Sequence, residues 1–185
     1  PNWRHLPVAY HGRAGTVVPS GTPIRRPLGQ RRGSEGPVFG PTEKLDVELE
    51  VGFVTGHGPA LGTPIPVDEA EHHIFGVCLV NDWSARDIQA WEYVPLGPFL
   101  GKSFATTISP WIIPIEALDP FRAPAEPQYP PPLPYLLEDK RRALNLDLRV
   151  TLITAEGVET TICSATFASM YWTMAQQLAH ATVNG

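Results

Sequence analysis

The sequence predicts an α+β fold that is rich in strands and has only a few short helices. Two segments, residues 44–54 and 144–154, alternate apolar and polar side chains with a period of two, which is typical of half-buried strands. The chain has 21 prolines among its 185 residues. Proline interrupts long helices and favours loops and short strands, so the helices are expected to be short.

The first half of the chain begins with a loop-rich region. Residues 1–42 are rich in Gly, Pro, Arg and Ser and are expected to form loops that join short strands. The strand over 44–54 follows, and the acidic residues at 68–73 then predict the first turn of a short helix. Residues 74–80 are continuously apolar, which predicts a strand buried on both faces.

The second half contains the other expected strands and the longest expected helix. Residues 103–115 are expected to form a strand and a turn, and the proline-dense residues 122–134 an extended, exposed loop. The strand over 144–154 is followed by a turn and a second strand over 158–163. Helical spacing in residues 169–181 predicts a final helix with four side chains on one face, namely Tyr171, Met174, Leu178 and Ala181.

Length, charge and cysteine content limit the class of protein. A chain of 185 residues is long enough for one domain with a core and marginal for two. The formal net charge of -5 leaves no basic stripe for nucleic acid, and no apolar run is long enough to span a membrane. Cys78 and Cys163 lie in apolar stretches, which predicts buried thiols in a reduced compartment and therefore a cytoplasmic protein.

The two ends suggest a piece of a longer protein. The chain begins at Pro1 without an initiator methionine. It stops at Gly185, directly after a helical pattern and in a position typical of a helix C-cap. We therefore expect an internal segment of a longer chain.

Three carboxylates are candidates for a metal site. Glu48 and Glu50 are two apart on the predicted strand, so both point the same way with about 7 Å between their Cα atoms. A solvent-facing acidic strand is the simpler interpretation of this pair. Asp82, at the end of the apolar strand, favours convergence of all three. An all-oxygen site of this kind suits Ca²⁺, Mg²⁺ or Mn²⁺ rather than zinc.

The segment 81–104 is unusually dense in functional groups. Asp82, Arg86, Gln89 and Tyr93 follow one another at intervals of four, three and four, which places them on one stripe if the segment is helical. Beside a metal, such a stripe would be a template for an anionic, oxygen-rich substrate, although it could also be the solvated face of an amphipathic helix. Lys102 could ligate a metal through its backbone, neutralise carboxylates or stabilise a developing anion, or form an ordinary salt bridge.

Several strings of the sequence closely resemble the fumarylacetoacetases of the fumarylacetoacetate hydrolase family. The resemblance covers nearly the whole chain and lies in Pro1–Trp3, Leu6–Arg13, Ser20–Pro27, Leu45–Glu50, Asn81–Phe104 and Tyr171–Leu178. It implies a mixed β-roll fold and a homodimer. It also implies hydrolysis of the carbon–carbon bond of the diketo acid 4-fumarylacetoacetate to fumarate and acetoacetate, the last step of tyrosine and phenylalanine breakdown.

The resemblance also implies roles for individual residues. The expected carboxylate ligands of a catalytic Ca²⁺ or Mg²⁺ are Glu48, Glu50 and Asp82. A neighbouring metal position is implied for Asp82, Lys102 and Thr106. Substrate contacts are implied for Tyr10, Gln89 and Tyr93. Lys102, Arg86 and Gln89 are expected to assist catalysis by stabilising the departing carbanion.

Other parts of the family's site are expected outside this chain. The fourth carboxylate ligand and the water-activating histidine would precede Pro1, and a substrate-binding threonine and a further glutamate would follow Gly185. Residues 1–185 are thus expected to be part of one catalytic domain without the family's N-terminal barrel domain, and inactive alone. Two alternatives remain open. One is another member of the superfamily, namely an acylpyruvate hydrolase, decarboxylase or isomerase, and the other is a catalytically inert metal-binding fragment.

Overall fold

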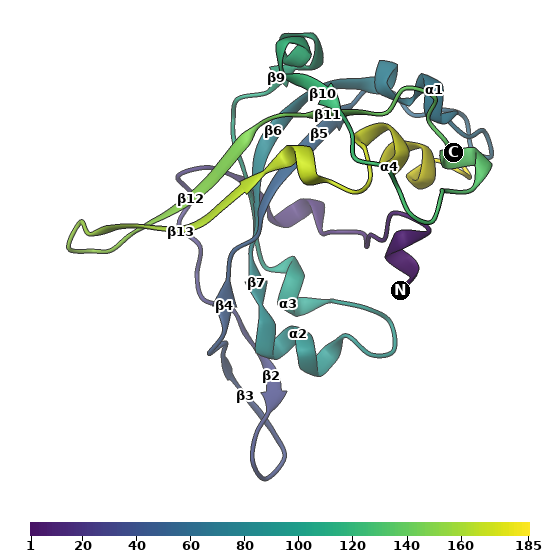
Figure 1. Cartoon of the computed structure of the whole chain (residues 1–185). Helices are drawn as coiled ribbons and strands as arrows, with labels where there is room; N and C mark the ends of the chain where they lie inside the picture. Colours follow the sequence, from purple (N-terminus) through teal and green to yellow (C-terminus); the bar gives the residue numbers. More distant parts are fainter. The chain divides into compact units, whose positions relative to one another are not determined.

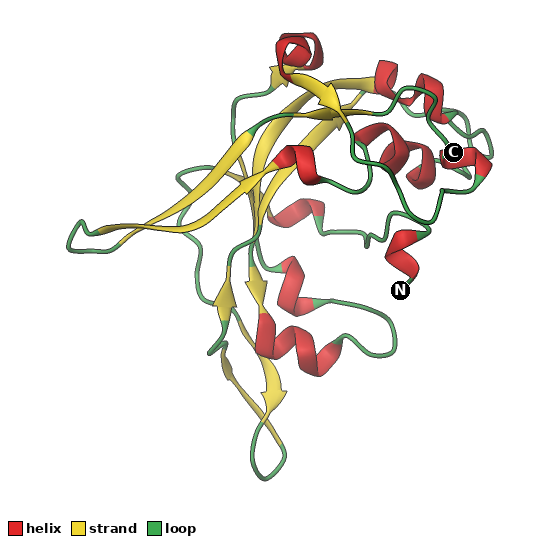
Figure 2. Cartoon of the chain, viewed as in Figure 1, coloured by secondary structure: helices red, strands yellow, loops and turns green.

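The computed structural model describes residues 1–185 and consists mainly of strands joined by loops and short helices (Figures 1 and 2). The longest strand, β6, has nine residues (Ile74–Asp82) and the longest α-helix, α4, has eight (Met174–Ala181). The predicted strand-rich α+β class is therefore confirmed. None of the helices combines the length and the apolar character needed to cross a lipid bilayer.

The chain divides into two compact units, which are described separately. Unit 1 comprises residues 1–8, 53–77 and 112–185. Unit 2 comprises residues 9–52 and 78–111.

Pairing in unit 2 places the end of β6 beside another strand. Strand β8 (Thr106–Ile108) pairs in parallel with β1 (Val17–Pro19) and antiparallel with β6, in a register that sets Asp82 opposite Thr106. The strand order is β1-β8-β6-β5. Asp82 is therefore the last residue of a strand and is held by its neighbour.

The continuous strand predicted over 44–54 is wrong, because the chain changes partners in its middle. Strand β4 (Leu45–Asp46) pairs antiparallel with β7 (Ser84–Ala85), whereas β5 (Leu49–Thr55) lies beside β6. In the link, the backbone N–H of Glu48 donates to Asn81 Oδ1 at 3.2 Å. The Glu48 carbonyl accepts from the backbone N–H of Asp82, also at 3.2 Å.

The predicted helical stripe that included Asp82 is also wrong at its start. Asp82 ends β6, β7 follows, and helix α2 begins only at Arg86 and ends at Glu92. Ala85, which precedes α2, has a non-helical φ of -101° and ψ of 88° because it pairs with β4. Only the later members of the stripe thus belong to, or immediately follow, the helix.

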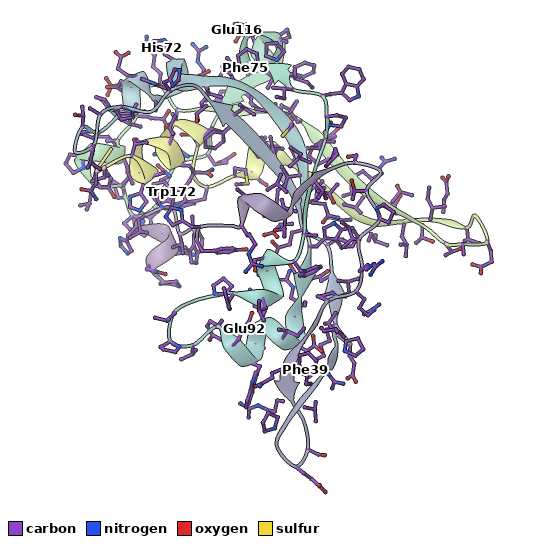
Figure 3. The ribbon with its side chains drawn as sticks, turned by 180° about the vertical axis from the view of Figure 1, so that it is seen from behind. Phe39, His72, Phe75, Glu92, Glu116 and Trp172 are labelled. Atoms are coloured by element: carbon purple, nitrogen blue, oxygen red, sulfur yellow. The ribbon has the colours of Figure 1, made fainter.

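A hairpin and helix α2 form the other layer of unit 2. Strand β2 (Leu28–Arg32) pairs antiparallel with β3 (Pro37–Pro41), whose Phe39 side chain is exposed (Figure 3). The buried Ile88 of α2 packs against Gly29 of β2, where a Cβ atom would come within 2.7 Å of Ile88. Glycine therefore permits this close approach. The short elements nearby are η2 (Ala14–Thr16) and α3 (Leu100–Ser103).

Unit 1 contains α4 and most of the short elements. The helical ones are η1 (Asn2–Arg4), α1 (Val67–Ala70), η3 (Glu71–His73), η4 (Ile115–Phe121), η5 (Pro134–Leu136) and η6 (Phe167–Ser169). The strands are β9 (Ile113–Pro114), β10 (Arg122–Pro124), β11 (Arg142–Leu144), β12 (Asp147–Ile153) and β13 (Glu159–Thr166). Strand β9 pairs with β6 at Gly76 and Val77, and β10 pairs with β11.

Helix α4 begins later than the predicted start at residue 169. The Thr173 side chain accepts the backbone N–H of Gln176, and the Gln176 side chain accepts that of Thr173. This capping box satisfies two free backbone donors, so the helix begins at Met174. Gln176 is fully buried and also donates to the Leu136 carbonyl at 2.7 Å, which ties α4 to η5. Trp172, labelled in Figure 3, donates from its indole Nε1 to the Trp3 carbonyl at 2.7 Å.

Strands β12 and β13 form a two-stranded ribbon with no third strand. The predicted alternation is visible to Val150 as partial burial, but Leu152 and all of β13 are exposed. The prediction that Cys163 is buried is therefore wrong, whereas Cys78 is buried as predicted. Burial of β6 on both faces is also wrong in part, because Phe75 and Leu79 are exposed.

Candidate metal and substrate site

Three carboxylates meet in unit 2, and we call Glu48, Glu50 and Asp82 the acidic cluster. One carboxylate oxygen from each lies within 4.8 Å of the others. Glu48 lies in the link between β4 and β5, Glu50 belongs to β5, and Asp82 ends β6. The convergence expected from the sequence is thus observed, and it depends on the change of strand partners at Glu48.

Lys102 is the main cation of the cluster. Its side chain is 2% exposed, and its Nζ lies 2.6 Å from Glu48 Oε2 and 2.7 Å from Asp82 Oδ2. The ammonium also donates to Ser84 Oγ at 2.8 Å. Burial acts to lower the pKa of Lys102, but the hydrogen bonds and charges of Asp82 and Glu48 outweigh it and raise the pKa. Lys102 therefore stays protonated at neutral pH.

Arg86 is the second cation. Its Nη2 lies 2.7 Å from Glu48 Oε1 and its Nε lies 2.8 Å from Asp46 Oδ2. Burial acts to raise the pKa of Glu48, but hydrogen bonds from Lys102 and Arg86 lower it overall. Arg86 Nη1 also donates to Gln89 Oε1 at 3.3 Å, which brings Gln89 to the edge of the cluster.

Negative charge exceeds positive charge at this point. Asp46, Glu48, Glu50 and Asp82 are four carboxylates against two cations, which leaves a formal charge of -2. Asp82 Oδ1 is buried and has no hydrogen-bond partner. Desolvation, with the charges of Asp82 and Glu48, raises the pKa of Glu50 to about 7. A divalent cation would balance the excess charge, give Asp82 Oδ1 a partner and lower the pKa of Glu50. The oxygen donors suit Ca²⁺, Mg²⁺ or Mn²⁺, so the residues fit a metal site.

Of the other predicted site residues, some contact or adjoin the acidic cluster and one does not. Tyr10 donates its hydroxyl to Asp82 Oδ2 at 2.9 Å, and burial with this hydrogen bond raises the pKa of Tyr10 to about 12. Thr106 lies opposite Asp82 in the sheet. Tyr93 directly follows α2, is half exposed and makes no hydrogen bond to the cluster. The structure therefore gathers Tyr10, Gln89 and Thr106 around the cluster and leaves Tyr93 at its outside.

Sequence reasoning missed three residues that organise the cluster. Asp46 binds Arg86, Ser84 accepts from Lys102, and Asn81 holds the backbone of Glu48. The first two carry a signal in the sequence, because each is two residues from a carboxylate of the cluster. Asn81 also carries a signal, because it directly precedes Asp82 at the end of the predicted apolar strand.

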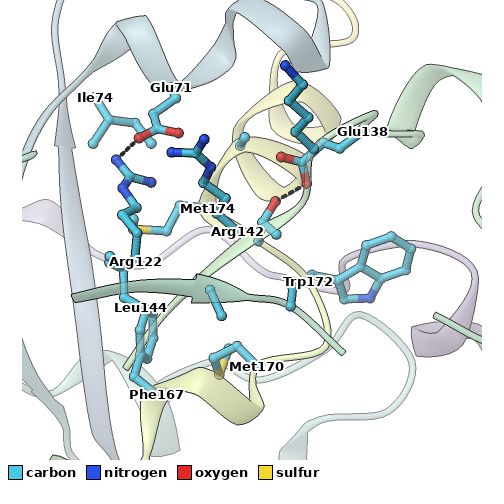
Figure 4. A pocket seen from close by; sticks show the side chains of 15 residues that line it. Glu71, Ile74, Arg122, Glu138, Arg142, Leu144, Phe167, Met170, Trp172 and Met174 are labelled. Atoms are coloured by element: carbon cyan, nitrogen blue, oxygen red, sulfur yellow. Dashed lines mark hydrogen bonds and ion pairs between the residues drawn. The ribbon is translucent and has the colours of Figure 1, made fainter. Parts of the chain in front are cut away.

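A second cavity, in unit 1, has a different character (Figure 4). Its volume is about 40 Å³, and some of its polar side chains pair with one another. Arg122 pairs with Glu71, and Thr173 donates its hydroxyl to Glu138 at 2.5 Å. The remaining wall includes apolar side chains such as Trp172. This cavity is therefore far smaller than a typical small-molecule site, which has a volume of roughly 300–1,000 Å³.

Comparison with known proteins finds fumarylacetoacetases that match this chain over its whole length. The chain is 58% identical to fumarylacetoacetase of Homo sapiens over 189 residues and 57% identical to that of Arabidopsis thaliana over 188 residues. Both comparisons cover 100% of this chain and 45% of the relative, so the chain spans less than half of those proteins.

The fold resembles the crystal structure of fumarylpyruvate hydrolase from Pseudomonas aeruginosa in complex with Mn²⁺ and pyruvate. The TM-score is 0.51 at 17% identity, and the match covers 90% of this chain and 55% of that chain. This likeness concerns the fold alone. The family model described as "Fumarylacetoacetate (FAA) hydrolase C-terminal" matches residues 1–184. Since that match takes in nearly every residue, the chain belongs to the fumarylacetoacetate hydrolase C-terminal family.

Proposed function

We propose that, in the full-length protein, this chain forms the metal- and substrate-binding part of a centre that hydrolyses 4-fumarylacetoacetate to fumarate and acetoacetate. One observation carries the proposal. Three carboxylate oxygens lie within 4.8 Å of one another beside a buried, protonated lysine. The name fumarylacetoacetase, which relatives 57–58% identical over the whole chain bear, supports the reaction.

Glu48, Glu50 and Asp82 would hold the metal, as Ca²⁺ or Mg²⁺. Asp82, Thr106 and the backbone of Lys102 would form a neighbouring metal position, because a protonated ammonium cannot ligate a metal. A bound divalent ion supplies Lewis acidity and a template for chelating oxygens, which suits a 1,3-diketone. The unpartnered Asp82 Oδ1 and the raised pKa of Glu50 support this assignment.

The chain's own side chains would provide hydrogen-bond donors for the reaction. Water adds to the carbonyl under attack, the carbon–carbon bond breaks, and the electron pair leaves as an enolate that is then protonated. The Lys102 ammonium and the neutral Tyr10 phenol, which both contact Asp82 Oδ2, would donate to oxygens that become negative. Arg86 and Gln89 would orient the substrate, with Tyr93 as an outer contact. The base that activates water would come from a part of the enzyme outside this chain.

The test uses the full-length enzyme and the loss of the substrate's ultraviolet absorbance. Treatment with a chelator should abolish turnover, and added Ca²⁺ or Mg²⁺ should restore it. Asp82→Asn should weaken metal binding at least about tenfold and remove most turnover, because a hard anionic ligand is lost while the side-chain size is kept. The matched control is Glu35→Gln, at an exposed position outside the cluster. Full activity in chelator, or in Asp82→Asn, would overturn the proposal.

The rest of the proposal follows the family. We place the enzyme in tyrosine and phenylalanine breakdown, as a cytoplasmic homodimer acting on a small diketo acid. Residues 1–185 would be part of one catalytic domain. Size-exclusion chromatography of the full-length protein tests the dimer, and an acylpyruvate offered as an alternative substrate tests the reaction.

A further inference from the structure

A cavity of about 250 Å³ lies next to the acidic cluster in unit 2. Tyr10 and Lys102, which both contact Asp82 of the acidic cluster, also line this cavity, so the cavity adjoins the cluster. The other walls come from two segments, His11–Arg13 and Pro98–Phe99, together with Ser103. At about 30 Å³ per water molecule, the cavity has room for roughly eight non-hydrogen atoms, the size of a four-carbon dicarboxylate.

Arg13 is the notable residue of this cavity. Its guanidinium makes no ion pair and no hydrogen bond within the protein, and it lies over the Phe99 ring at 5.7 Å from the ring centre. Arginine guanidinium stacks well on aromatic faces and still presents its N–H groups to a carboxylate. Arg13 is therefore held in place by Phe99 while its hydrogen-bonding capacity remains unused.

Ser103 supplies a second unused polar group. Its Oγ is buried and has no hydrogen-bond partner. The Thr16 hydroxyl oxygen lies 2.9 Å from the Ser103 carbonyl oxygen and 3.1 Å from the Arg13 carbonyl oxygen, so its one hydrogen can be donated to either. Thr16 thus joins the two walls that carry Arg13 and Ser103. A buried polar group without a partner is costly unless a ligand or water satisfies it.

Charge is distributed unevenly between the cluster and this cavity. The cluster side has excess negative charge, whereas the unpaired Arg13 lines the cavity. A ligand with metal-chelating oxygens at one end and a carboxylate at the other would match both. We infer that Arg13 is a specificity-determining residue that binds the terminal carboxylate of the substrate arm occupying this cavity. This inference rests on the proposed function for the identity of the substrate.

The experiment compares Arg13→Met with Arg32→Met in the full-length enzyme. Arg32 is a matched control, because it is also exposed, makes no ion pair, and lies over an aromatic ring, that of Trp91, at 5.7 Å. Arg13→Met should raise the KM for the diketo diacid and the inhibition constant of fumarate at least tenfold, with little change in kcat. Arg32→Met should leave both constants unchanged, and Arg13→Lys should have an intermediate effect.

A substrate analogue that lacks the terminal carboxylate provides the second comparison. Wild type and Arg13→Met should hydrolyse this neutral-ended analogue with similar kcat/KM. If Arg13→Met lost kcat/KM equally on both substrates, the inference would be overturned and Arg13 would have a structural role. Unchanged constants on both substrates would also overturn the inference. Fumarate binding measured by calorimetry does not depend on turnover. It therefore tests the role of Arg13 even if the full-length protein hydrolyses no diketo acid. Absence of that hydrolysis would overturn the proposed function but not the role of Arg13 in binding fumarate.

Discussion

Glu50 differs from the other two carboxylates of the acidic cluster in its electrostatic surroundings. Glu48 and Asp82 each contact the Lys102 ammonium, whereas Glu50 makes no ion pair. Desolvation and the charges of Asp82 and Glu48 raise its pKa to about 7, although part of the side chain remains exposed. Glu50 is thus the member of the cluster whose protonation changes near neutral pH.

Metal binding should therefore depend on pH through Glu50. Below pH 7 a proton and the cation compete for this carboxylate, so affinity for Ca²⁺ or Mg²⁺ at pH 6 should be about tenfold weaker than at pH 8. Isothermal titration calorimetry of the full-length protein in buffers of different ionisation enthalpy would measure the affinity and the proton released. Glu50→Gln should bind more weakly at pH 8 and lose most of this pH dependence. A wild-type affinity that is flat from pH 6 to 8 would contradict the assignment.

The same shift affects the stability of the metal-free protein in a defined direction. The folded pKa of Glu50 is raised above the unfolded value of 4.5, so its contribution to stability is complete below pH 4.5 and lost as pH rises through about 7. Because the side chain is partly exposed, we expect about 1 kcal/mol or less. In chelator, thermal unfolding of wild type should shift downward from pH 5.5 to pH 8 more than that of Glu50→Gln.

At the scale of elements, two short helices position Lys102. Helix α3 carries Lys102 and packs against α2 at Gly101, where a Cβ atom would come within 2.7 Å of the Gln89 backbone nitrogen. The Gly101 N–H also donates to Glu92 Oε1 at 2.6 Å. The ammonium that pairs with Glu48 and Asp82 is thus held by a contact between backbones, and only glycine allows it.

Gly101→Ala should damage the site without removing any functional group. The added methyl group meets backbone rather than a flexible side chain, so α3 must move and carry Lys102 with it. We expect a loss of about 1–3 kcal/mol of stability and at least a tenfold fall in kcat/KM. Gly40→Ala is the control, because nothing lies within 4 Å of a Cβ atom at that position. If both variants kept wild-type kinetics, the positioning role of Gly101 would be wrong.

At the scale of the whole molecule, the chain is 45% as long as the relatives it matches and leaves many large apolar side chains exposed. They include Leu61, Leu96 and Trp111, which are 94%, 96% and 79% exposed. Apolar exposure on this scale is typical of surfaces that another part of a protein covers. The proposed reaction also needs a base, which the family resemblance assigns to a residue outside this chain.

The isolated 185-residue chain should therefore show no measurable hydrolysis of the diketo acid. Loss of a positioned general base alone removes a factor of about 10² to 10⁴. Both this chain and the full-length parent should be assayed at equal concentration with saturating metal. Comparable activity in the two would mean that the base lies within the chain. His11, which lines the cavity beside Tyr10, would then be the first candidate.

The sequence by itself determined the strand-rich α+β class, the family and the residue types of the site. Period-two alternation and abundant proline indicate strands and short helices from local sequence alone. The carboxylates of Glu48, Glu50 and Asp82 are recognisable as possible metal ligands from residue type alone. Only the tertiary structure decided how these residues meet. Glu48 reaches Asp82 because the chain leaves one sheet and enters another at that point, and the predicted single strand missed this change.

Other outcomes depended on tertiary packing for the same reason. Cys163 is exposed because its strand gains no third partner, and α2 starts at Arg86 because Ala85 pairs with β4. Local sequence determines which backbone conformations have low free energy, and long-range strand pairing decides which of them is adopted. The pairing of Lys102 with both Glu48 and Asp82, and the stacking of Arg13 on Phe99, arise from contacts between segments far apart in the chain.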